Sequence, residues 1–235
     1  MNPRAEPLLW IQLLGLAVLP LEALLLLLVL GGSDPGPVPL VEQLLCWSLG
    51  GVAAALLLWR TPADVWSVLV AQIPGRGRRD LQQRLSRLQT TMPLKLLGPG
   101  LGAVALLPLL IRMDQLSAIA APLWHPSHLP RLVALLLAAL LLTVMLWQWQ
   151  QVVQALWLLT RSPSVVEATP AMGLPEREES RLSLGIPLLL LSPLLFEAPK
   201  SASVESSGID GPALPVEPEQ PPADEEGTHL DEPIA

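Results

Sequence analysis

Long apolar blocks dominate the pattern of hydrophobic and polar positions along the chain. They have no polar face of the kind that a helix keeps toward water in a soluble domain. A helix that crosses about 30 Å of hydrocarbon needs roughly 20 apolar residues. Four runs meet that requirement: Leu8–Leu30, Leu40–Trp59, Leu94–Ile111 and Leu132–Trp149. We therefore predict an all-α integral membrane protein with four transmembrane helices.

The connections between these runs predict the topology. The first, from Gly31 to Pro37, is rich in Gly and Pro and indicates a tight turn, so we expect the first two spans to form a hairpin. The second, residues 60–95, contains seven basic residues, whereas the third, residues 112–131, contains two. The positive-inside rule then places the N-terminus, the second connection and the C-terminus in the cytoplasm. This topology requires an even number of spans.

Two segments complicate the number of spans. The first run has Arg4 ahead of it like a signal peptide, but its length and the missing small-x-small site favour a retained anchor. Leu182–Phe196 is short and is interrupted by Pro187 and Pro193. We interpret it as an interfacial or re-entrant segment. The alternative, a fifth span, would place the C-terminal tail on the opposite side.

Small and aromatic residues in the runs predict packing and depth. Pairs of small residues four apart allow close approach between helices in lipid, and they are Gly50/Ala54, Gly98/Gly102 and Ala134/Ala138. Tryptophans near span ends favour the membrane interface, and they are Trp10, Trp59, Trp66, Trp124 and Trp147. A single helix from Arg131 to Thr160 would be about 45 Å long. The glutamines at 148, 150 and 151 favour its protrusion into the cytoplasmic headgroup region.

The second connection contains a predicted amphipathic helix from Asp80 to Met92. Its apolar positions form one helical stripe: Leu81, Leu85, Leu88 and Met92. Asp80 is expected to cap the first turn, with Gln83 reaching back to it. Five arginines surround the other faces: Arg76, Arg78, Arg79, Arg84 and Arg87. This helix is expected to lie on the membrane surface and to bind anionic lipid headgroups or a protein partner; the alternative is a solvated loop that only sets topology. Nucleic acid is excluded as a partner because no aromatic residues interleave the arginines.

Charge separates the C-terminal tail from the rest. The formal charge is -7, but residues 201–235 contain nine Asp or Glu and no Lys or Arg, so the remainder is slightly basic. Such a stretch cannot bury enough apolar surface to fold. We predict a transmembrane domain at 1–160, a membrane-associated connector at 161–199 and a disordered, acidic, low-complexity tail at 200–235. The tail is either a solvated spacer or a segment that contacts the basic second connection or a basic partner.

Few residues suggest chemistry. Glu22 lies within the first span, where a carboxyl either handles protons or cations, or is protonated and bonded to the backbone that Pro20 leaves open. Glu42 and Asp114 lie at span ends, within reach of water. His125 and His128 lack the further ligands that a metal site needs, and the single cysteine, Cys46, is typical of a buried thiol. No catalytic constellation or cofactor motif is recognisable, so we expect a protein that is not an enzyme and holds no cofactor.

The opening segment, Glu6 to Leu21, resembles the start of the cyanobacterial family called low-complexity tail membrane proteins. The exit from the second span, Trp59-Arg60-Thr61-Pro62, and the polar tail extend the resemblance. It implies a cyanobacterial thylakoid or plasma membrane and no assigned activity. The function expected is a scaffold or accessory protein, for example in assembly or maintenance of photosynthetic membrane complexes, with a membrane-protein partner or as a homo-oligomer. The alternative is a small transporter or channel component that uses Glu22.

Overall fold

Four long helices form the body of the protein. The computed structural model describes residues 2–34, 36–67, 71–73, 78–120, 129–183 and 186–187. Within these residues, four helices are long and apolar enough to cross a membrane: Pro7–Gly31, Pro39–Arg60, Met92–Ile119 and Arg131–Leu159. The prediction of an all-α membrane protein with four spans is confirmed.

Two of the spans contain a π-helical turn. The first span is α1 (Pro7–Gly31), which continues through Pro20, and the fourth is α7 (Arg131–Leu159). The second consists of α2 (Pro39–Trp47), the π-helical turn η2 (Ser48–Val52) and α3 (Ala53–Arg60). The third consists of α5 (Met92–Lys95), the π-helical turn η4 (Leu96–Gly100) and α6 (Leu101–Ala120).

Short elements lie outside the spans. They are η1 (Pro3–Ala5), α4 (Asp80–Arg87), α8 (Pro163–Ala168), α9 (Leu174–Ser180), β1 (Ala71–Gln72) and β2 (Ile186–Pro187). The two-residue strands pair in parallel, and an isolated bridge joins Ala63 to Leu182. Leu182 and β2 belong to the segment that was predicted to be interfacial or re-entrant. The described start of that segment therefore pairs with the second connection. The rest of that segment lies outside the described residues.

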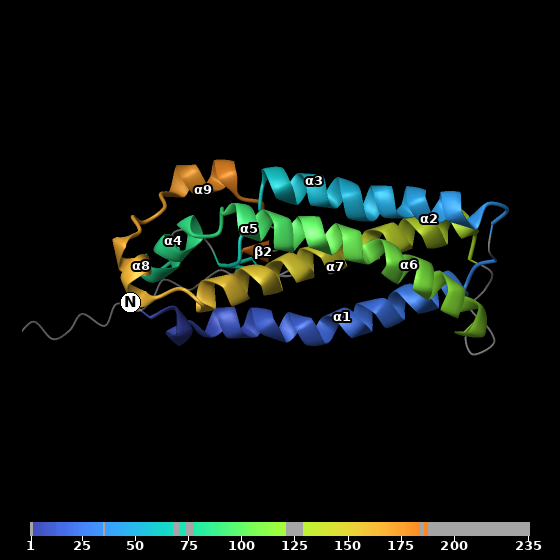
Figure 1. The fold of residues 1–235 in the computed structure, drawn as a ribbon, viewed down its shortest axis with the longest axis horizontal. Helices are drawn as coiled ribbons and strands as arrows, with labels where there is room; N and C mark the ends of the chain where they lie inside the picture. The colour runs from blue at the N-terminus through green and yellow to red at the C-terminus, as the bar shows by residue number, and fades with distance from the viewer. Residues whose placement is uncertain are drawn as a thin grey trace, which may run out of the picture. The chain divides into compact units, whose positions relative to one another are not determined.

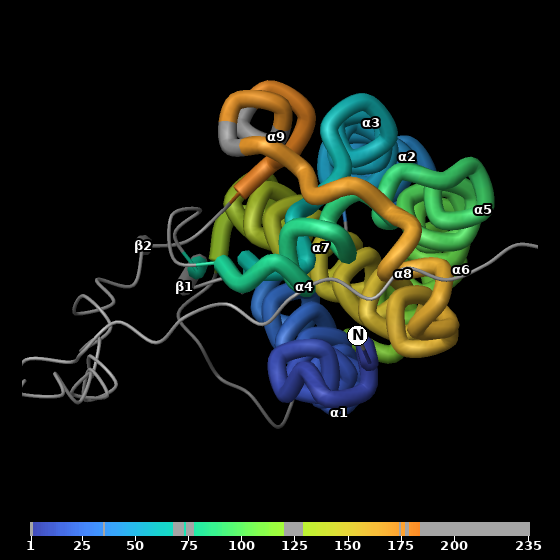
Figure 2. Tube along the Cα trace, turned by 90° about the vertical axis from the view of Figure 1, so that its left-hand side faces the viewer, coloured from blue at the N-terminus to red at the C-terminus, as the bar shows by residue number. Residues whose placement is uncertain are grey.

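Helix α7 is the centre of the bundle. It packs against α1, against the second span and against the third, and α6 also contacts α1 and α2. Figures 1 and 2 show α1 and the α2–α3 span on opposite sides of α7. The first two spans follow each other in the chain but do not pack as a pair, so the prediction that they form a helical hairpin is wrong. The second span packs instead on α7, because its small residues allow a closer approach there than leucine-rich α1 allows.

Small residues of the spans allow close contacts between the helices. A Cβ added to Gly50 would overlap the backbone of Ala139, and Thr143 Oγ1 on α7 donates to the Gly50 carbonyl at 3.0 Å. Gly98 and Gly102 also face side chains of α7, while Ala134 and Ala138 are fully buried. The close approach predicted at Gly50 and at Gly98/Gly102 is confirmed, and the Ala134/Ala138 face is buried within the bundle. Both π-helical turns include one of these glycines, so the irregular turns lie where the spans approach α7.

One end of the bundle is covered by a polar cap, which we define as residues 61–67, 78–91 and 161–183. Its apolar core joins Val65, Trp66 and Leu85 to Leu9 of α1 and Leu158 of α7. Figure 1 shows α4, α8 and α9 at the end where α1 begins and α7 ends. The N-terminus, the second connection and the residues after α7 therefore lie at one end, as an even number of spans requires. Residues 1–191 form one compact unit, so the described part of the predicted connector packs on the transmembrane domain.

Candidate functional site

Arg78, predicted to lie at the membrane surface, is an internal residue. Its Nη2 lies 2.5 Å from Asp64 Oδ2, and the two side chains are 2% and 0% exposed. The same nitrogen donates to the carbonyl of Ile73 at 3.2 Å. Because both charges are out of contact with solvent and lipid headgroups, this pair holds the second connection together and does not present a charge to a partner.

The other predicted arginines occupy different environments. Arg84 pairs with Asp80 at 2.8 Å and donates to the carbonyls of Glu167 and Thr169. Arg87 pairs with Glu176 of α9 at 2.6 Å. Arg79 is exposed and forms no ion pair within the described part of the chain. Arg76 lies outside the described residues. Of the five, Arg79 is thus the cation that the described surface leaves most available.

Helix α4 packs on protein along its apolar stripe. Leu85 is fully buried in the cap core, and Leu81 and Leu88 pack against that core. The helix begins at Asp80 as predicted, but the predicted cap is wrong: Arg79 is the cap residue, and its backbone N–H donates to Gln82 Oε1 at 3.2 Å. The predicted stripe also ends early, because Met92 belongs to α5.

A buried stretch of backbone, residues 61–67, is held by glutamine side chains. Gln151 Nε2 donates to the carbonyls of Asp64 and Ser67, both at 3.1 Å, and Gln154 Nε2 donates to that of Ala63 at 3.0 Å. Gln12 Nε2 of α1 donates to the carbonyl of Val65 at 2.8 Å. The polar face at the end of α7 therefore faces this loop. Gln150 and Gln151, predicted to favour protrusion of this helix end into the headgroup region, are buried against protein, and the protrusion itself stays a prediction.

Two tryptophans predicted as interfacial anchors are also internal. Trp66 is buried and its Nε1 donates to Ser86 Oγ at 2.9 Å, while Trp147 is buried within the bundle. Trp10 is 52% exposed and donates to the carbonyl of Arg4, as an interfacial indole would. Trp124 lies outside the described residues.

Arg181 closes the cap from the C-terminal side. Its Nη2 donates to the Ser86 carbonyl and to Thr90 Oγ1, each at 2.6 Å. Burial lowers the pKa of Arg181 to about 10, although Asp64 and Glu176 act in the opposite direction. The side chain therefore stays a cation at neutral pH, and it ties the segment after α9 to α4 and to the loop that follows α4.

A second ionic cluster lies at the opposite end of the bundle, around Arg131. Its guanidinium lies 2.8 Å from a Glu42 oxygen and 3.3 Å from an Asp114 oxygen, and it also donates to Ser33 Oγ. Gln43 Nε2 donates to Asp114 at 2.7 Å. The two carboxylates predicted to face water thus share one arginine. This cluster joins the first connection, α2, α6 and the start of α7.

Glu22 lies buried in α1, with 7% of its surface exposed. Its Oε2 has no hydrogen-bond partner in the part of the chain that the structure describes. The structure therefore gives no support to the hypothesis that this oxygen bonds to the backbone near Pro20. An unpartnered carboxyl in hydrocarbon is costly unless it is protonated or shielded.

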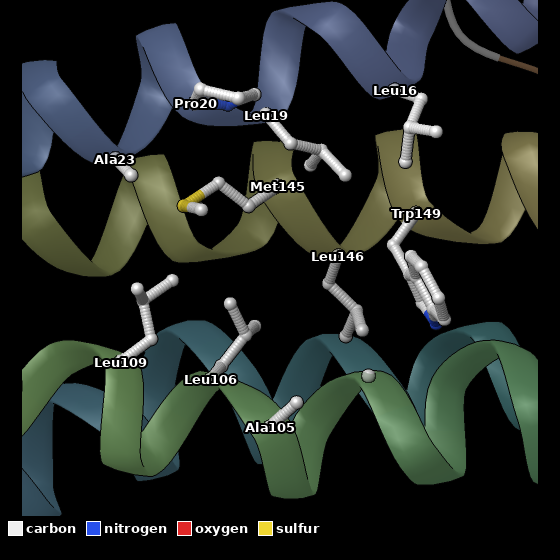
Figure 3. A pocket seen from close by; sticks show the side chains of 11 residues that line it. Leu16, Leu19, Pro20, Ala23, Ala105, Leu106, Leu109, Met145, Leu146 and Trp149 are labelled. Atoms are coloured by element: carbon white, nitrogen blue, oxygen red, sulfur yellow. The ribbon is translucent and has the colours of Figure 1, made fainter.

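An apolar groove of about 520 Å³ lies between α1, α6 and α7 (Figure 3). Side chains of α1 and α6 face each other across it, and those of α7 form its floor. The lining residues are Leu16, Leu19, Pro20, Ala23, Gly102, Ala105, Leu106, Leu109, Met145, Leu146 and Trp149. Sequence reasoning missed this groove, because its small residues look like ordinary packing positions until neighbouring helices are known.

Within the described ranges, no three His, Cys, Asp or Glu side chains lie close enough together to hold a metal ion. Cys46 is buried and its thiol donates to the carbonyl of Leu135 at 3.4 Å. This agrees with the predicted buried thiol. His125 and His128 lie outside the described residues.

These features define a polytopic α-helical membrane protein whose polar residues join its connections into a folded cap. The chain belongs to the low-complexity tail membrane protein-like family, whose model matches residues 5–193. No curated protein and no solved structure matches the chain.

Proposed function

We propose that the protein is a non-catalytic scaffold or accessory subunit that binds a membrane-protein partner at its polar cap. The observation that carries this proposal is the internal use of the cap's charged groups. Arg78, Asp64 and Arg181 bind other cap residues, and the glutamines of α7 bind the loop backbone. A cap built in this way presents a preformed surface, and a preformed surface loses little conformational entropy on binding.

The exposed charges of the cap supply a recognition surface. Arg79 is unpaired within the described chain, and the arginines of two partly exposed pairs, Arg84–Asp80 and Arg87–Glu176, lie in the same segment. Opposite charges on a partner would select its orientation, because rim charges mainly contribute specificity. By the positive-inside rule this surface is cytoplasmic, and the resemblance to cyanobacterial proteins points to a thylakoid or plasma membrane complex undergoing assembly or maintenance.

Photo-crosslinking in the native membrane tests this proposal. p-Benzoylphenylalanine placed at residue 79 is expected to give an adduct with one protein. The same probe at Leu45, a lipid-facing position of α2, serves as the control and is expected to give lipid adducts. Arg79→Glu is expected to reduce recovery of the partner in mild detergent, whereas Arg60→Glu is not. Only lipid adducts at both positions would refute partner binding at the cap.

A second candidate function, a small transporter component, is favoured by the unpartnered Glu22 carboxyl. A lone ionisable group in a span is a candidate carrier of protons or cations. Glu22→Gln keeps the shape of the side chain and removes the titratable group. Loss of ion-dependent growth with normal protein levels would support transport, and unchanged growth would refute it.

A further inference from the structure

We propose that the groove between α1, α6 and α7 binds one anionic phospholipid. One acyl chain lies in the groove, an ester carbonyl accepts a hydrogen bond from Gln148, and the phosphate lies near Lys95. Three chemistries follow one another along the helices in the order that a phospholipid needs: hydrocarbon, amide and cation. This inference does not depend on the scaffold proposal.

The groove has the size and lining for a flexible chain. Its volume of about 520 Å³ lies within the range of roughly 300–1,000 Å³ for small-molecule pockets. A helix about 10 Å across occupies roughly 120 Å³ per residue, so the groove would hold only about one helical turn. A partner's transmembrane helix would therefore leave most of its length outside the groove. An acyl chain can follow the side chains in Figure 3 and fill the gaps between them.

Gln148 provides an unsatisfied amide beside the groove. It lies on α7 between the lining residues Met145 and Trp149, and a Cβ on Gly15 of α1 would overlap its amide. Within the described chain its side chain makes no hydrogen bond, whereas Trp149 Nε1 already donates to Leu97 at 2.9 Å. An amide without a partner is costly in an apolar environment. The ester carbonyl of a lipid is an acceptor of the right kind.

Lys95 provides the cation beyond the amide. It lies seven residues before Gly102, a lining residue of the same span, which corresponds to about 10 Å along a helix. Lys95 is half-buried and forms no ion pair within the described residues. It also lies at the end of the bundle that holds the polar cap, where the third span begins. A phosphate at this position would meet an unneutralised ammonium.

Two measurements on the intact wild-type protein test occupancy. Native mass spectrometry from nanodiscs of mixed phosphatidylglycerol and phosphatidylcholine is expected to show one retained phosphatidylglycerol. A phosphatidylglycerol with a mid-chain diazirine is expected to label peptides from all three lining helices. Random labelling of the outer leucines, or retention of both lipids in their bulk ratio, would overturn the proposal.

Matched variants test the three contacts. Ala105→Trp fills the groove and is expected to reduce lipid retention at least tenfold, whereas Val104→Trp, at a lipid-exposed neighbour, is not. Ala105→Leu serves as a milder filling variant if the tryptophan impairs folding. Gln148→Leu is expected to weaken retention of both lipids. Lys95→Gln is expected to lower the preference for phosphatidylglycerol about fivefold, the factor for one surface charge, and Arg60→Gln to leave it unchanged.

Each of these measurements tests one part of the proposal. Equal retention by the two tryptophan variants would overturn groove binding, and an unchanged preference in Lys95→Gln would overturn the phosphate assignment. Labelling of a partner protein's helix at the groove, in place of lipid, would overturn the lipid as occupant.

Discussion

Two ionic clusters neutralise buried or partly buried charges within the described part of the protein. Asp64 and Arg78 neutralise each other inside the polar cap, and Arg131 bridges two carboxylates at the other end. Burying an ion pair does not by itself stabilise a fold, because desolvation opposes the attraction. Removing one member is different, since the remaining charge stays buried without compensation.

Arg78→Leu should therefore destabilise the protein strongly. We expect a loss of about 3–5 kcal/mol in the free energy of unfolding, because Asp64 would be left unpaired. Arg87→Leu, which removes a partly exposed pair with Glu176, should cost about 0.2–1 kcal/mol. Unfolding by SDS titration in mild detergent micelles measures both. The double variant Arg78→Leu/Asp64→Leu should recover part of the loss, and equal small losses in the two single variants would contradict the assignment.

Residue patterns identified which segments are apolar and which are charged, but they could not say which side chains contact one another. The arginines of the second connection were recognisable as a basic set, yet the sequence does not say that Arg78 faces Asp64. Trp66 and Gln151 have amphipathic side chains that suit a membrane interface as well as a buried polar contact. Only the folded loop provides the acceptors that draw them inward.

At the scale of elements, α7 determines how the bundle is arranged. Helix α1 packs on one side of α7, and the second and third spans pack on its other sides through their small residues. Span positions were predictable from length and hydropathy, since hydrocarbon thickness sets the number of apolar residues. Which helices pack against each other was not predictable in the same way, because a short connection does not force two leucine-rich faces together. The small-residue pairs carried that information.

Gly50→Ala tests this packing. The added Cβ would overlap the backbone of Ala139, which cannot move without separating α7 from the second span. We expect a loss of about 1–3 kcal/mol in unfolding free energy, as for other overpacked sites. Gly100→Ala is the control, because a Cβ there meets only ordinary contacts, the nearest at 3.4 Å. A loss no larger than that of the control would show that the helices adjust without strain.

At the scale of the whole molecule, the polar cap links the N-terminus to the residues that follow α7. Gln82 of the second connection donates to Glu6 at 3.2 Å, and Arg84 donates to the carbonyl of Glu167 beyond the fourth span. These contacts require both segments to be on one side of the membrane. The seven basic residues of the second connection favour the cytoplasmic side.

Cysteine labelling tests this sidedness. Cys46→Ser removes the single native thiol and keeps a donor toward the Leu135 carbonyl. In that background, a cysteine at Asp34 should react with a membrane-impermeant maleimide in intact cells. Cysteines at Arg79 and at Ser162 should react only after permeabilisation. Labelling of residues 79 and 162 from opposite sides would contradict the fold, and reversed labelling of all three would contradict only the orientation.

The hydrogen bonds from glutamines to the loop after the second span can form only late in the synthesis of the chain. The carbonyls of Ala63 and Asp64 leave the ribosome long before their donors, which lie 91 and 87 residues later in the chain. Until the fourth span is synthesised and inserted, this stretch stays hydrated or must be sheltered by the insertion machinery. A nascent chain arrested before residue 150 should therefore be cleaved readily by protease at residues 61–67, whereas the completed protein should resist.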